Sequence, residues 1–456
     1  MSNPGQADPT PITAARQLAE WFAKGSKPRH AWRIGTEHEK FGFRRDGLAP
    51  PAYRPEGIEA MLQGLRKSSA SGVAWSPIED AGHVIGLTRG MESVSLEPGG
   101  QFELSGAPLA DLHATRLELA EHMRAVHAVA APLGLGFSGM GFHPLATREA
   151  MPWMPKSRYA IMRRYMPLKG SMGLDMMLRT CTVQANLDFG DEADMVEKLR
   201  VSLALQPLAT ALFASSPLRE GKPSGFKSLR GHVWSDTDGD RTGIPACVFE
   251  DGFGFERFAE YVLDVPMYFV ARPSGAGLRL HDVAGASFRE FMQGKLDALP
   301  GEVATMGDVA DHVTTVFTEV RLKRFLEMRG SDAGSAAMIL AKPAFWVGLL
   351  YDDAAQKAAR ALTRDWTVAQ MHALRAEAPA RALEASIAGR SLRDVARDAL
   401  AISESGLRAR GLGEEAYLAP LHEIVHSGMT QADRLLQMFH GPWQGDARPA
   451  LEFMEL

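Results

Sequence analysis

The chain has 456 residues, of which 45% are hydrophobic and 23% are charged. This is the composition of a globular protein with a sizeable core, and it excludes a largely disordered chain. Lys and Arg number 50 and Asp and Glu number 55, so the formal net charge of -5 argues against a nucleic-acid-binding protein, which usually carries a basic excess. The two cysteines exclude a disulfide scaffold and a multi-cysteine zinc module, and they favour a reducing compartment.

The N-terminal sequence, MSNPGQADPTPITAARQ, lacks the apolar run of a signal peptide and does not have the composition of a transit peptide. The most apolar segment towards the C-terminus, residues 344–351, is far shorter than the ~20 residues that a membrane helix needs. We therefore expect a soluble, cytoplasmic protein.

Hydrophobic periodicity predicts the elements in chain order. Residues 1–12 are expected to form a flexible tail, and residues 32–43 a strand. Helices are predicted from about residue 15 to 22 and over residues 108–131, 192–214 and 332–351. Beyond residue 352 Ala, Arg, Leu and Glu dominate and strand patterns end. We expect a catalytic α+β region over residues 13–351, with a helical region over residues 352–456 packed on it.

Two predicted strands carry polar side chains at every second position, and successive side chains of a strand point to opposite faces. In residues 181–189 the odd positions are apolar, and the even positions are Thr182, Gln184, Asn186 and Asp188. Residues 319–329, taken as one strand, place five ionisable side chains on one face, namely Glu319, Arg321, Lys323, Glu327 and Arg329. We expect these faces to present rows of hydrogen-bonding and charged groups.

Two further segments repeat the pattern with carboxylates. Glu37 and Glu39 share a face in residues 35–43, and Gln101 and Glu103 share one in residues 101–104. Antiparallel strands also alternate in this way when one face is simply solvated. A sheet lined by carboxylates and guanidinium groups is, however, a suitable floor for a metal–nucleotide site, because Mg²⁺ takes oxygen ligands and Arg matches phosphate oxygens. The pattern therefore favours phosphoryl transfer.

Two short motifs match known signatures. Residues 134–139 fit GxGxxG, but the dinucleotide fingerprint needs a preceding strand and here a helix precedes, so we interpret the motif as a helix-to-strand turn. His422 and His426 fit HExxH, and a helix would place both on one face. A zinc hydrolase with His440 or Glu452 as the third ligand is therefore an alternative, although the motif lies in the helical region, away from the polar strands.

A basic segment and two cysteines are further candidates. The segment 151–167 is bracketed by prolines and contains Lys156, Arg158, Arg163 and Arg164. It is either a basic surface helix or an anion-facing lid. Cys181 falls on the apolar side of its strand, where a core role is typical, and the sequence leaves open whether it pairs with Cys247.

Longer segments carry a resemblance. They are residues 33–43 (RIGTEHEKFGF), 95–108 (SLEPGGQFELSGAP), 176–189 (MMLRTCTVQANLDF), 234–243 (WSDTDGDRTG), 263–269 (LDVPMYF) and 325–332 (FLEMRGSD). Together they resemble the plant-type glutamate–cysteine ligases, a family shared with many proteobacteria. The resemblance extends from about residue 15 to the C-terminus, so it is far more specific than either short motif.

The resemblance implies a glutamine-synthetase-like α+β fold, in which a curved antiparallel sheet forms the active site, helices lie outside it and the C-terminal part is helical. It also implies an enzyme that uses ATP and Mg²⁺ to join the γ-carboxylate of L-glutamate to the amine of L-cysteine through a γ-glutamyl phosphate. This reaction is the first step of glutathione biosynthesis. The implied partners are these small molecules, with no nucleic acid or membrane, and the protein would be a monomer or a homodimer.

The same resemblance implies roles for individual residues. Those implied for metal binding are Glu37, Glu39, Glu97, Glu103 and Glu327. Those implied for catalysis are Arg329, Arg230 and Lys323. Those implied for substrate binding are Arg241, Trp234, Gln184 and Asn186. Those implied for nucleotide or phosphate binding are Lys156 and Arg158. These charges suit the chemistry, because both phosphorylation of a carboxylate and attack by an amine build negative charge that cations must stabilise.

Other functions stay open at this point. A γ-glutamyl ligase with a different amine acceptor would share the chemistry, because few side chains decide specificity between small amines. A catalytically silent homologue and the zinc hydrolase are alternatives of other classes. Plant members carry redox-active disulfides, whereas this chain has two cysteines, so we do not expect thiol-switch control.

Overall fold

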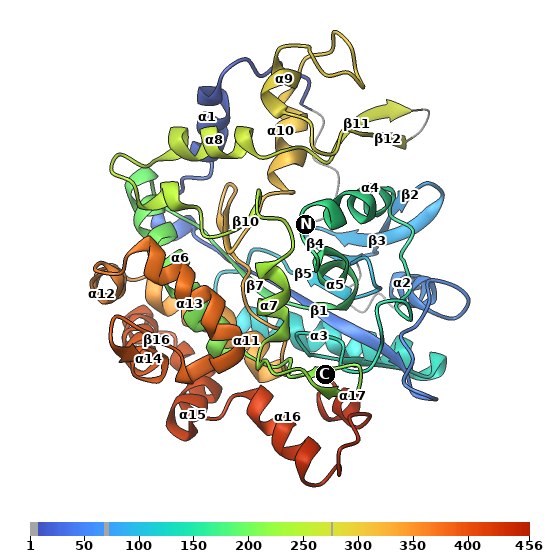
Figure 1. Cartoon of the computed structure of the whole chain (residues 1–456), viewed down its shortest axis with the longest axis vertical. Helices are drawn as coiled ribbons and strands as arrows, with labels where there is room; N and C mark the ends of the chain where they lie inside the picture. Colours follow the sequence, from blue (N-terminus) through green and yellow to red (C-terminus); the bar gives the residue numbers. More distant parts are fainter. Residues whose placement is uncertain (1–7, 68–72, 275–276) are drawn as a thin grey trace.

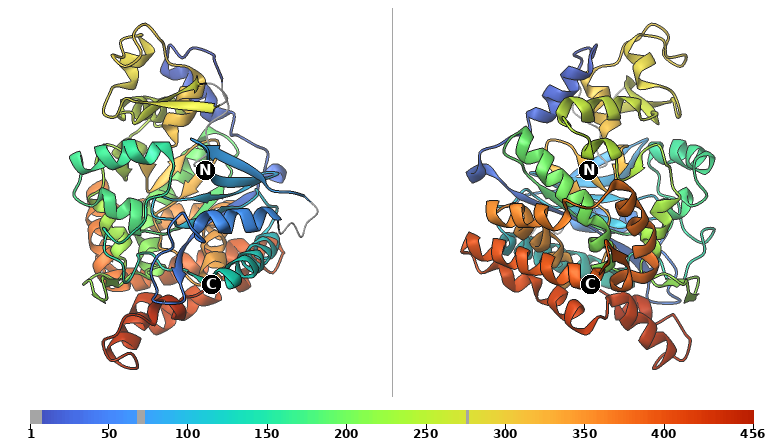
Figure 2. Two further views of the ribbon diagram at one scale, coloured as in Figure 1. Left: turned by 90° about the vertical axis from the view of Figure 1, so that its right-hand side faces the viewer. Right: turned by 60° about the vertical axis from the view of Figure 1, so that its left-hand side comes forward.

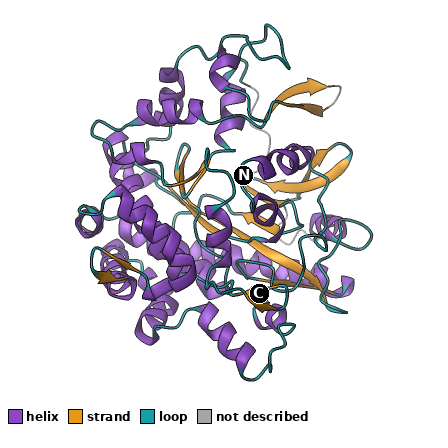
Figure 3. Cartoon of the chain, viewed as in Figure 1, coloured by secondary structure: helices purple, strands orange, loops and turns teal. Residues whose placement is uncertain are grey.

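A nine-stranded antiparallel sheet crosses the centre of the molecule in the computed structural model, which describes residues 8–67, 73–274 and 277–456 (Figures 1 and 3). The strand order is β14-β15-β7-β1-β5-β4-β3-β2, and β6 also pairs with β1. The strands are β1 (Ile34–Arg44), β2 (Ser76–Asp80), β3 (His83–Arg89), β4 (Glu92–Leu96), β5 (Phe102–Ser105), β6 (Leu135–Ser138), β7 (Val183–Leu187), β14 (Val320–Leu322) and β15 (Leu326–Met328). The predicted α+β class with an antiparallel sheet is confirmed.

The register of the sheet gathers the polar residues on one face. Glu37 of β1 lies opposite Gln184 of β7, and Glu39 lies opposite Glu103 of β5. Directly opposed residues of neighbouring strands point to the same face, so three carboxylates and an amide come together. The odd residues of β7, such as Ala185, are fully buried in the hydrophobic core instead. The period-two pattern therefore predicted both faces of these strands correctly.

The prediction of a single strand over residues 319–329 is wrong. The structure has two three-residue strands, β14 and β15, that form an antiparallel hairpin in which Arg321 lies opposite Glu327. The two numbers of each pair in this register differ by an even number, so odd-numbered residues share one face of the hairpin as they would in one strand. Alternation alone does not distinguish the two cases.

The apolar face of the sheet is covered by the predicted helices. α3 (Leu112–Ala130) contacts β1, α6 (Glu192–Leu212) contacts β14 and β15, and α11 (Ala336–Leu350) contacts β1 and β7. The last helix begins four residues later than predicted, because Asp332 forms an extended bridge with Thr182. α3 also begins late, at the N-cap Asp111, whose side chain accepts a hydrogen bond from Ala114 N.

Further helices pack around the sheet and at the upper end of the molecule. They are α1 (Ala15–Ala23), α2 (Ile58–Lys67), α4 (Ser157–Tyr165), α5 (Gly173–Arg179), α7 (Leu229–Ser235), α8 (Phe255–Asp264), α9 (Phe288–Met292) and α10 (Met306–Val313). The hairpin of β11 (Phe269–Ser274) and β12 (Gly277–Asp282) lies at this upper end in Figure 1. Residues 1–7 of the predicted flexible tail lie outside the described residues. Residues 8–12 are not a free tail, because Ile12 is fully buried and its N–H donates to Ala304 O at 2.9 Å.

The C-terminal helices run from the flank of α6 to the end of the molecule opposite β11 and β12, where the last of them, drawn in red, lie (Figure 2). They are α12 (Asp353–Thr363), α13 (Val368–Arg381), α14 (Leu392–Arg410), α15 (Ala419–Ser427), α16 (Gln431–His440) and α17 (Ala450–Phe453). Short strands are also present, namely β8 (Leu218–Arg219), β9 (Lys222–Pro223), β10 (Thr242–Gly243), β13 (Phe317–Thr318), β16 (Ser386–Ile387) and β17 (Arg390–Ser391). One hydrophobic cluster joins Trp346 of α11 to Val395 of α14, so the core is continuous across residue 352. No helix within the described ranges is both long and apolar enough to cross a membrane.

Candidate active site

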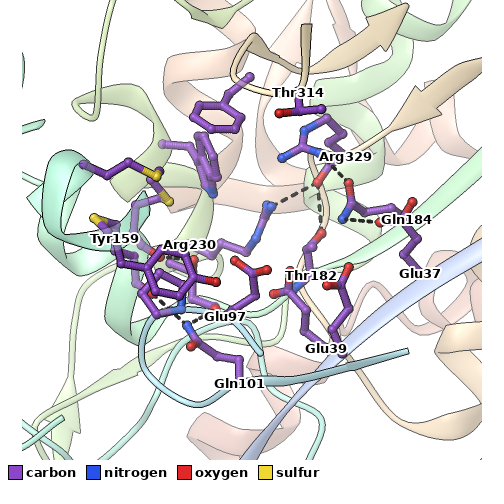
Figure 4. A pocket seen from close by; sticks show the side chains of 18 of the residues that line it. Glu37, Glu39, Glu97, Gln101, Tyr159, Thr182, Gln184, Arg230, Thr314 and Arg329 are labelled. Carbon is purple, nitrogen blue, oxygen red and sulfur yellow. Dashed lines mark hydrogen bonds between the residues drawn. The ribbon is translucent and has the colours of Figure 1, made fainter. Parts of the chain in front are cut away.

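A cavity of about 100 Å³ opens on the polar face of the sheet (Figure 4). Its floor is formed by β1, β5 and β7, and its walls come from α4, α5, α7 and the segments around β13 and β14. The predicted site residues that line it are Glu37, Glu39, Glu97, Glu103, Gln184, Arg158, Arg230, Trp234 and Arg329. Segments nearly 300 residues apart in the sequence therefore meet in one place.

Four carboxylates line one side of this cavity, partly from the strands of its floor. They are Glu37, Glu39, Glu97 and Glu103, and we call them the acidic wall. Glu39 accepts a hydrogen bond from Thr182 N at 2.9 Å, and Glu103 accepts one from Ser95 Oγ at 2.9 Å. Burial and the charge of Glu97 raise the pKa of Glu103 to about 7. Burial and the charges of Glu97 and Glu103 likewise raise the pKa of Glu39 well above its usual range. These acids repel one another, and a bound cation would relieve that repulsion.

The acidic wall has the donor chemistry for Mg²⁺, which prefers carboxylate and amide oxygens. Asn186 donates to Glu37 Oε1 at 2.7 Å, while its own buried Oδ1 has no hydrogen-bond partner within the described residues. In that same part of the chain, no three His, Cys, Asp or Glu side chains are already grouped as a metal site. The donor types fit the ion, although the side chains are not drawn together around one point.

Basic side chains face the acidic wall. Arg329 donates to Gln184 Oε1 at 2.8 Å, and Arg230 donates to the carbonyl oxygen of Arg329 at 3.0 Å. Three buried nitrogens at the cavity have no hydrogen-bond partner within the described residues, namely Arg158 Nε, Arg230 Nε and Trp234 Nε1. Buried donors are usually satisfied, so this arrangement suits an anionic ligand that supplies acceptors.

A buried ion cluster lies beneath the arginines. Glu327 is fully buried and contacts Arg321 at 2.5 Å, Lys323 at 3.2 Å and Arg329 at 3.2 Å. Burial opposes its ionisation, but these three cations hold the pKa of Glu327 well below its usual range. Glu327 and Lys323 therefore neutralise each other below the cavity and do not line it. The metal role of Glu327 and the catalytic role of Lys323 stay predictions.

Three of the predicted binding residues, Asn186, Arg241 and Lys156, do not line this cavity. Arg241 is fully buried, donates to Asp238 at 2.7 Å and to Pro266 O at 2.8 Å, and stacks on Tyr268. It does not line the cavity, so the expectation that it binds substrate is not supported by its position. Lys156 lies at the start of α4, is buried, and donates to Leu96 O at 2.7 Å.

Several lining residues were not predicted. Tyr159 lies on α4 and donates to Leu96 O at 2.6 Å, while Thr314 and Phe317 come from the segment after α10. Arg321 lines the cavity as well as binding Glu327. Position on the basic segment could have indicated Tyr159, but no sequence pattern marks Thr314 or Phe317.

A second cavity, of about 510 Å³, adjoins the first, because Arg158 and Thr314 line both. Apolar side chains, including Ile78, Ile85 and Phe269, form much of its wall, and Lys156 also lines it. The first cavity alone is smaller than a typical ligand pocket of roughly 300–1,000 Å³. The two together have room for a ligand with a flat apolar part and an anionic part.

The remaining motifs lie away from this site. Gly134 has φ 63° and ends the turn between α3 and β6, as the interpretation of the glycine motif requires. His422 and His426 lie on α15, and His422 Nε2 is 3.9 Å from Glu404 Oε2. Cys181 and Cys247 are both free and buried.

Comparisons with known proteins agree with the resemblance seen in the sequence. The chain is 50% identical over 442 residues to the chloroplastic glutamate–cysteine ligase of Arabidopsis thaliana, covering 97% of this chain and 83% of that protein. It is 49% identical to the chloroplastic glutamate–cysteine ligase B of Oryza sativa subsp. japonica, covering 97% and 87%. Its fold resembles that of a glutamate–cysteine ligase from Francisella tularensis in complex with AMP, with a TM-score of 0.55, 12% identity, and coverage of 93% and 87%.

These relatives contradict the expected cytoplasmic location. The similar plant proteins are named as chloroplastic enzymes, which points to a plastid rather than to the cytoplasm. The model of glutamate–cysteine ligase family 2 matches residues 33–453, which is nearly the whole chain. The chain therefore belongs to glutamate–cysteine ligase family 2.

Proposed function

We propose that this protein is an ATP-dependent glutamate–cysteine ligase. It joins the γ-carboxylate of L-glutamate to the amine of L-cysteine and releases ADP and phosphate. The observation that carries the proposal is the cavity itself, in which four carboxylates face Arg158, Arg230 and Arg329, in a chain of this family. Relatives that are about half identical over nearly all of the chain carry this enzyme's name.

The reaction needs two displacement steps. A carboxylate is a poor electrophile, so an oxygen of the glutamate γ-carboxylate first attacks the γ-phosphorus of ATP, and ADP leaves. The cysteine amine then attacks the γ-carbonyl carbon of the resulting γ-glutamyl phosphate, the amine loses a proton, and phosphate leaves. Both steps concentrate negative charge on phosphoryl and carbonyl oxygens, which Arg329 and Arg230, two lining residues of the cavity, would stabilise.

The acidic wall would hold Mg²⁺. Glu37, Glu39, Glu97 and Glu103 supply carboxylate oxygens, and bound Mg²⁺ would neutralise phosphate charge and act as a Lewis acid. Without such neutralisation the acidic wall would repel the negatively charged triphosphate of ATP. Glu327 lies behind the arginines and would act on the reaction through them.

The larger cavity would take the adenosine part of ATP. Its apolar wall suits a flat purine, and Arg158 at the junction of the two cavities would meet the phosphates. The unpaired Nε of Arg158 supports this assignment. Lys156 contributes positive charge nearby, although its amine is held by the carbonyl oxygen of Leu96.

Gln184, Asn186 and Trp234 would bind substrate. Gln184 links the acidic wall to the arginines that face it, because its Oε1 accepts from Arg329 and its Nε2 lies 3.5 Å from Glu37 Oε2. The unpaired indole nitrogen of Trp234 would donate to a carboxylate of glutamate. We also propose that residues 13–351 form the catalytic region and that residues 352–456 form a helical region packed on it. The protein would be a monomer or a homodimer.

The test is ADP release by purified protein with ATP, Mg²⁺ and glutamate, with and without cysteine, followed by mass spectrometry of the product. We expect cysteine-dependent ADP release and formation of γ-glutamylcysteine. Release that depends on another amine would keep the mechanism and replace the acceptor. No ATP turnover with any amine would refute the proposal.

A further inference from the structure

A buried carboxylate behind the cavity is linked to two of the arginines that line it, Arg230 and Arg329. Asp332 is 1% exposed and does not line the cavity. Its Oδ2 accepts hydrogen bonds from Ser215 N at 2.9 Å and Ser216 Oγ at 2.6 Å, and its Oδ1 accepts one from Ser228 Oγ at 2.6 Å. Asp332 thus lies where the end of α6, the start of α7 and the segment after β15 meet.

The two serine hydroxyls each make a second hydrogen bond, to the first turn of α7. Ser216 Oγ accepts from Arg230 N at 3.3 Å, and Ser228 Oγ accepts from Gly231 N at 3.0 Å. A hydroxyl has one hydrogen, so donation to the carboxylate turns the oxygen lone pairs towards these backbone N–H groups. The acceptor at Asp332 thereby fixes the direction of both bonds at the start of α7.

α7 carries Arg230 and Trp234 into the cavity. The side chain of Arg230 also donates to the carbonyl oxygen of Arg329, which is three residues before Asp332. Thr182 Oγ1 donates to the same carbonyl at 3.0 Å and to Ser331 O at 2.7 Å. The segment from Arg329 to Asp332 is therefore held at both ends. Arg329 belongs to this segment, and Arg230 is hydrogen-bonded to it.

The carboxylate also has no room to move. A Cβ atom on Gly141 would lie 2.3 Å from Cγ of Asp332, so the chain has glycine where the carboxylate needs the space. Ser215 closes the other side, since its Oγ accepts from Gly141 N at 3.1 Å and donates to Ala333 O at 2.5 Å. A rigid acceptor of this kind holds the groups bonded to it at fixed positions.

We propose that Asp332 is the positioning residue for Arg230: through Ser216 and Ser228 it sets the start of α7, the helix that carries the Arg230 guanidinium into the cavity. The inference rests on the proposed function, in which Arg230 stabilises charge on the reacting groups. It assigns a role in the ligase reaction to a side chain that never touches the substrate.

Asp332→Asn tests the acceptor without changing its size. Ser215 N can only donate, so it keeps the single amide oxygen, and the amide nitrogen then faces Ser228 Oγ. That hydroxyl receives two donors and loses the acceptor for its own hydrogen, so the hydrogen bond that it accepts from Gly231 N at the start of α7 is disturbed. We expect kcat/KM for the ligase reaction to fall roughly 10–100-fold, the range for a lost hydrogen bond to a charged group.

The decisive experiment is a double-mutant cycle on ADP release, with Arg230→Ala as the second substitution. If Asp332 acts through Arg230, Asp332→Asn has little further effect on kcat/KM once Arg230 is absent. Multiplied losses, or near-normal kcat/KM in Asp332→Asn, would overturn the inference. Ser228→Ala gives the same test with a smaller change if Asp332→Asn does not fold. Ser202→Ala is the matched control, since this buried hydroxyl on α6 has no partner within the described residues.

The activity of the wild-type protein distinguishes a failure of this inference from a failure of the proposed function. An active wild type with unaffected variants would overturn the inference and leave the proposed function intact. An inactive wild type would refute the proposed function, and the inference with it. Thermal unfolding of each variant completes the comparison, because a purely structural role would lower Tm in parallel with activity whether or not Arg230 is present.

Discussion

The substitution Glu327→Gln would remove the one negative charge that three cations share, namely the buried Arg321 and Lys323 and the partly buried Arg329. Glu327 is fully buried and contacts Arg321, Lys323 and Arg329 within 3.2 Å. Glutamine keeps the shape of the side chain but leaves these cations without their common counter-charge. Glu319→Gln on the same segment is the matched control, because Glu319 contacts one cation, Arg375, at 2.6 Å.

The expected loss follows from the cost of breaking a buried ion pair. Removing one partner costs about 3–5 kcal/mol, because the remaining charge is buried without compensation. An unfolding entropy of about 2.1 cal/mol/K per residue over 456 residues is about 1 kcal/mol/K, so Tm should fall by roughly 3–5 °C. For Glu319→Gln the loss should be about 1–2 kcal/mol and the fall in Tm correspondingly smaller.

Thermal unfolding and ADP release measure the two consequences. Because Arg321 and Arg329 line the cavity and lose their anchor, we expect kcat/KM of Glu327→Gln to fall at least roughly 10-fold, about 1.4 kcal/mol. We reason that Glu327 compensates the positive charges of this cluster. Equal Tm values for the wild type, Glu327→Gln and Glu319→Gln would refute that reasoning.

Three further predictions concern single side chains. Glu39→Gln should lose at least roughly 100-fold in turnover while Tm is unchanged or higher, because it removes a proposed metal ligand and a charge that its acidic neighbours repel. Near-normal turnover at saturating Mg²⁺ would contradict the metal assignment. Glu118, partly buried on α3, has a pKa raised to about 7 by burial, so the folded state binds an extra proton between about pH 4.5 and 7 and loses stability as pH rises. Glu118→Gln should therefore raise Tm relative to the wild type at pH 8 but not at pH 4.5, and an equal change at both would refute this. His422→Ala should leave ADP release unchanged, and a large loss in a folded variant would revive the zinc alternative.

The strands of the site could be predicted because their chemistry repeats every second residue. Gln184 lies on the polar face of a strand whose other face is core, and this alternation is visible without any structure. In β1 the face opposite Glu37 carries Thr36, His38 and Lys40, which are buried although polar, so the spacing of Glu37 and Glu39 indicated only their shared face. The acidic wall follows from it once the strands pair. The family resemblance then ordered these residues into one site, which period alone could not do.

Residues outside such a period could not be placed from the sequence. Arg241 is enclosed by Asp238, three residues away, but also by Pro266 and Tyr268, whose approach depends on the tertiary fold. Thr314 lines both cavities from a turn after α10. Positions of this kind are decided by packing between distant segments, and nothing in their local sequence distinguishes a buried structural arginine from a ligand-binding one.

The two buried acids behind the cavity explain how the site holds several arginines near one another. Glu327 contacts Arg321 and Arg329, and Asp332 is joined through the Ser216 hydroxyl to the backbone N–H of Arg230. Because both acids lie outside the cavity, the arginines are held in place without being covered. Charges fixed before the substrate arrives stabilise a transition state without the cost of reorganising water or side chains during the reaction. The acids most important for the arginines are therefore those that the substrate does not touch.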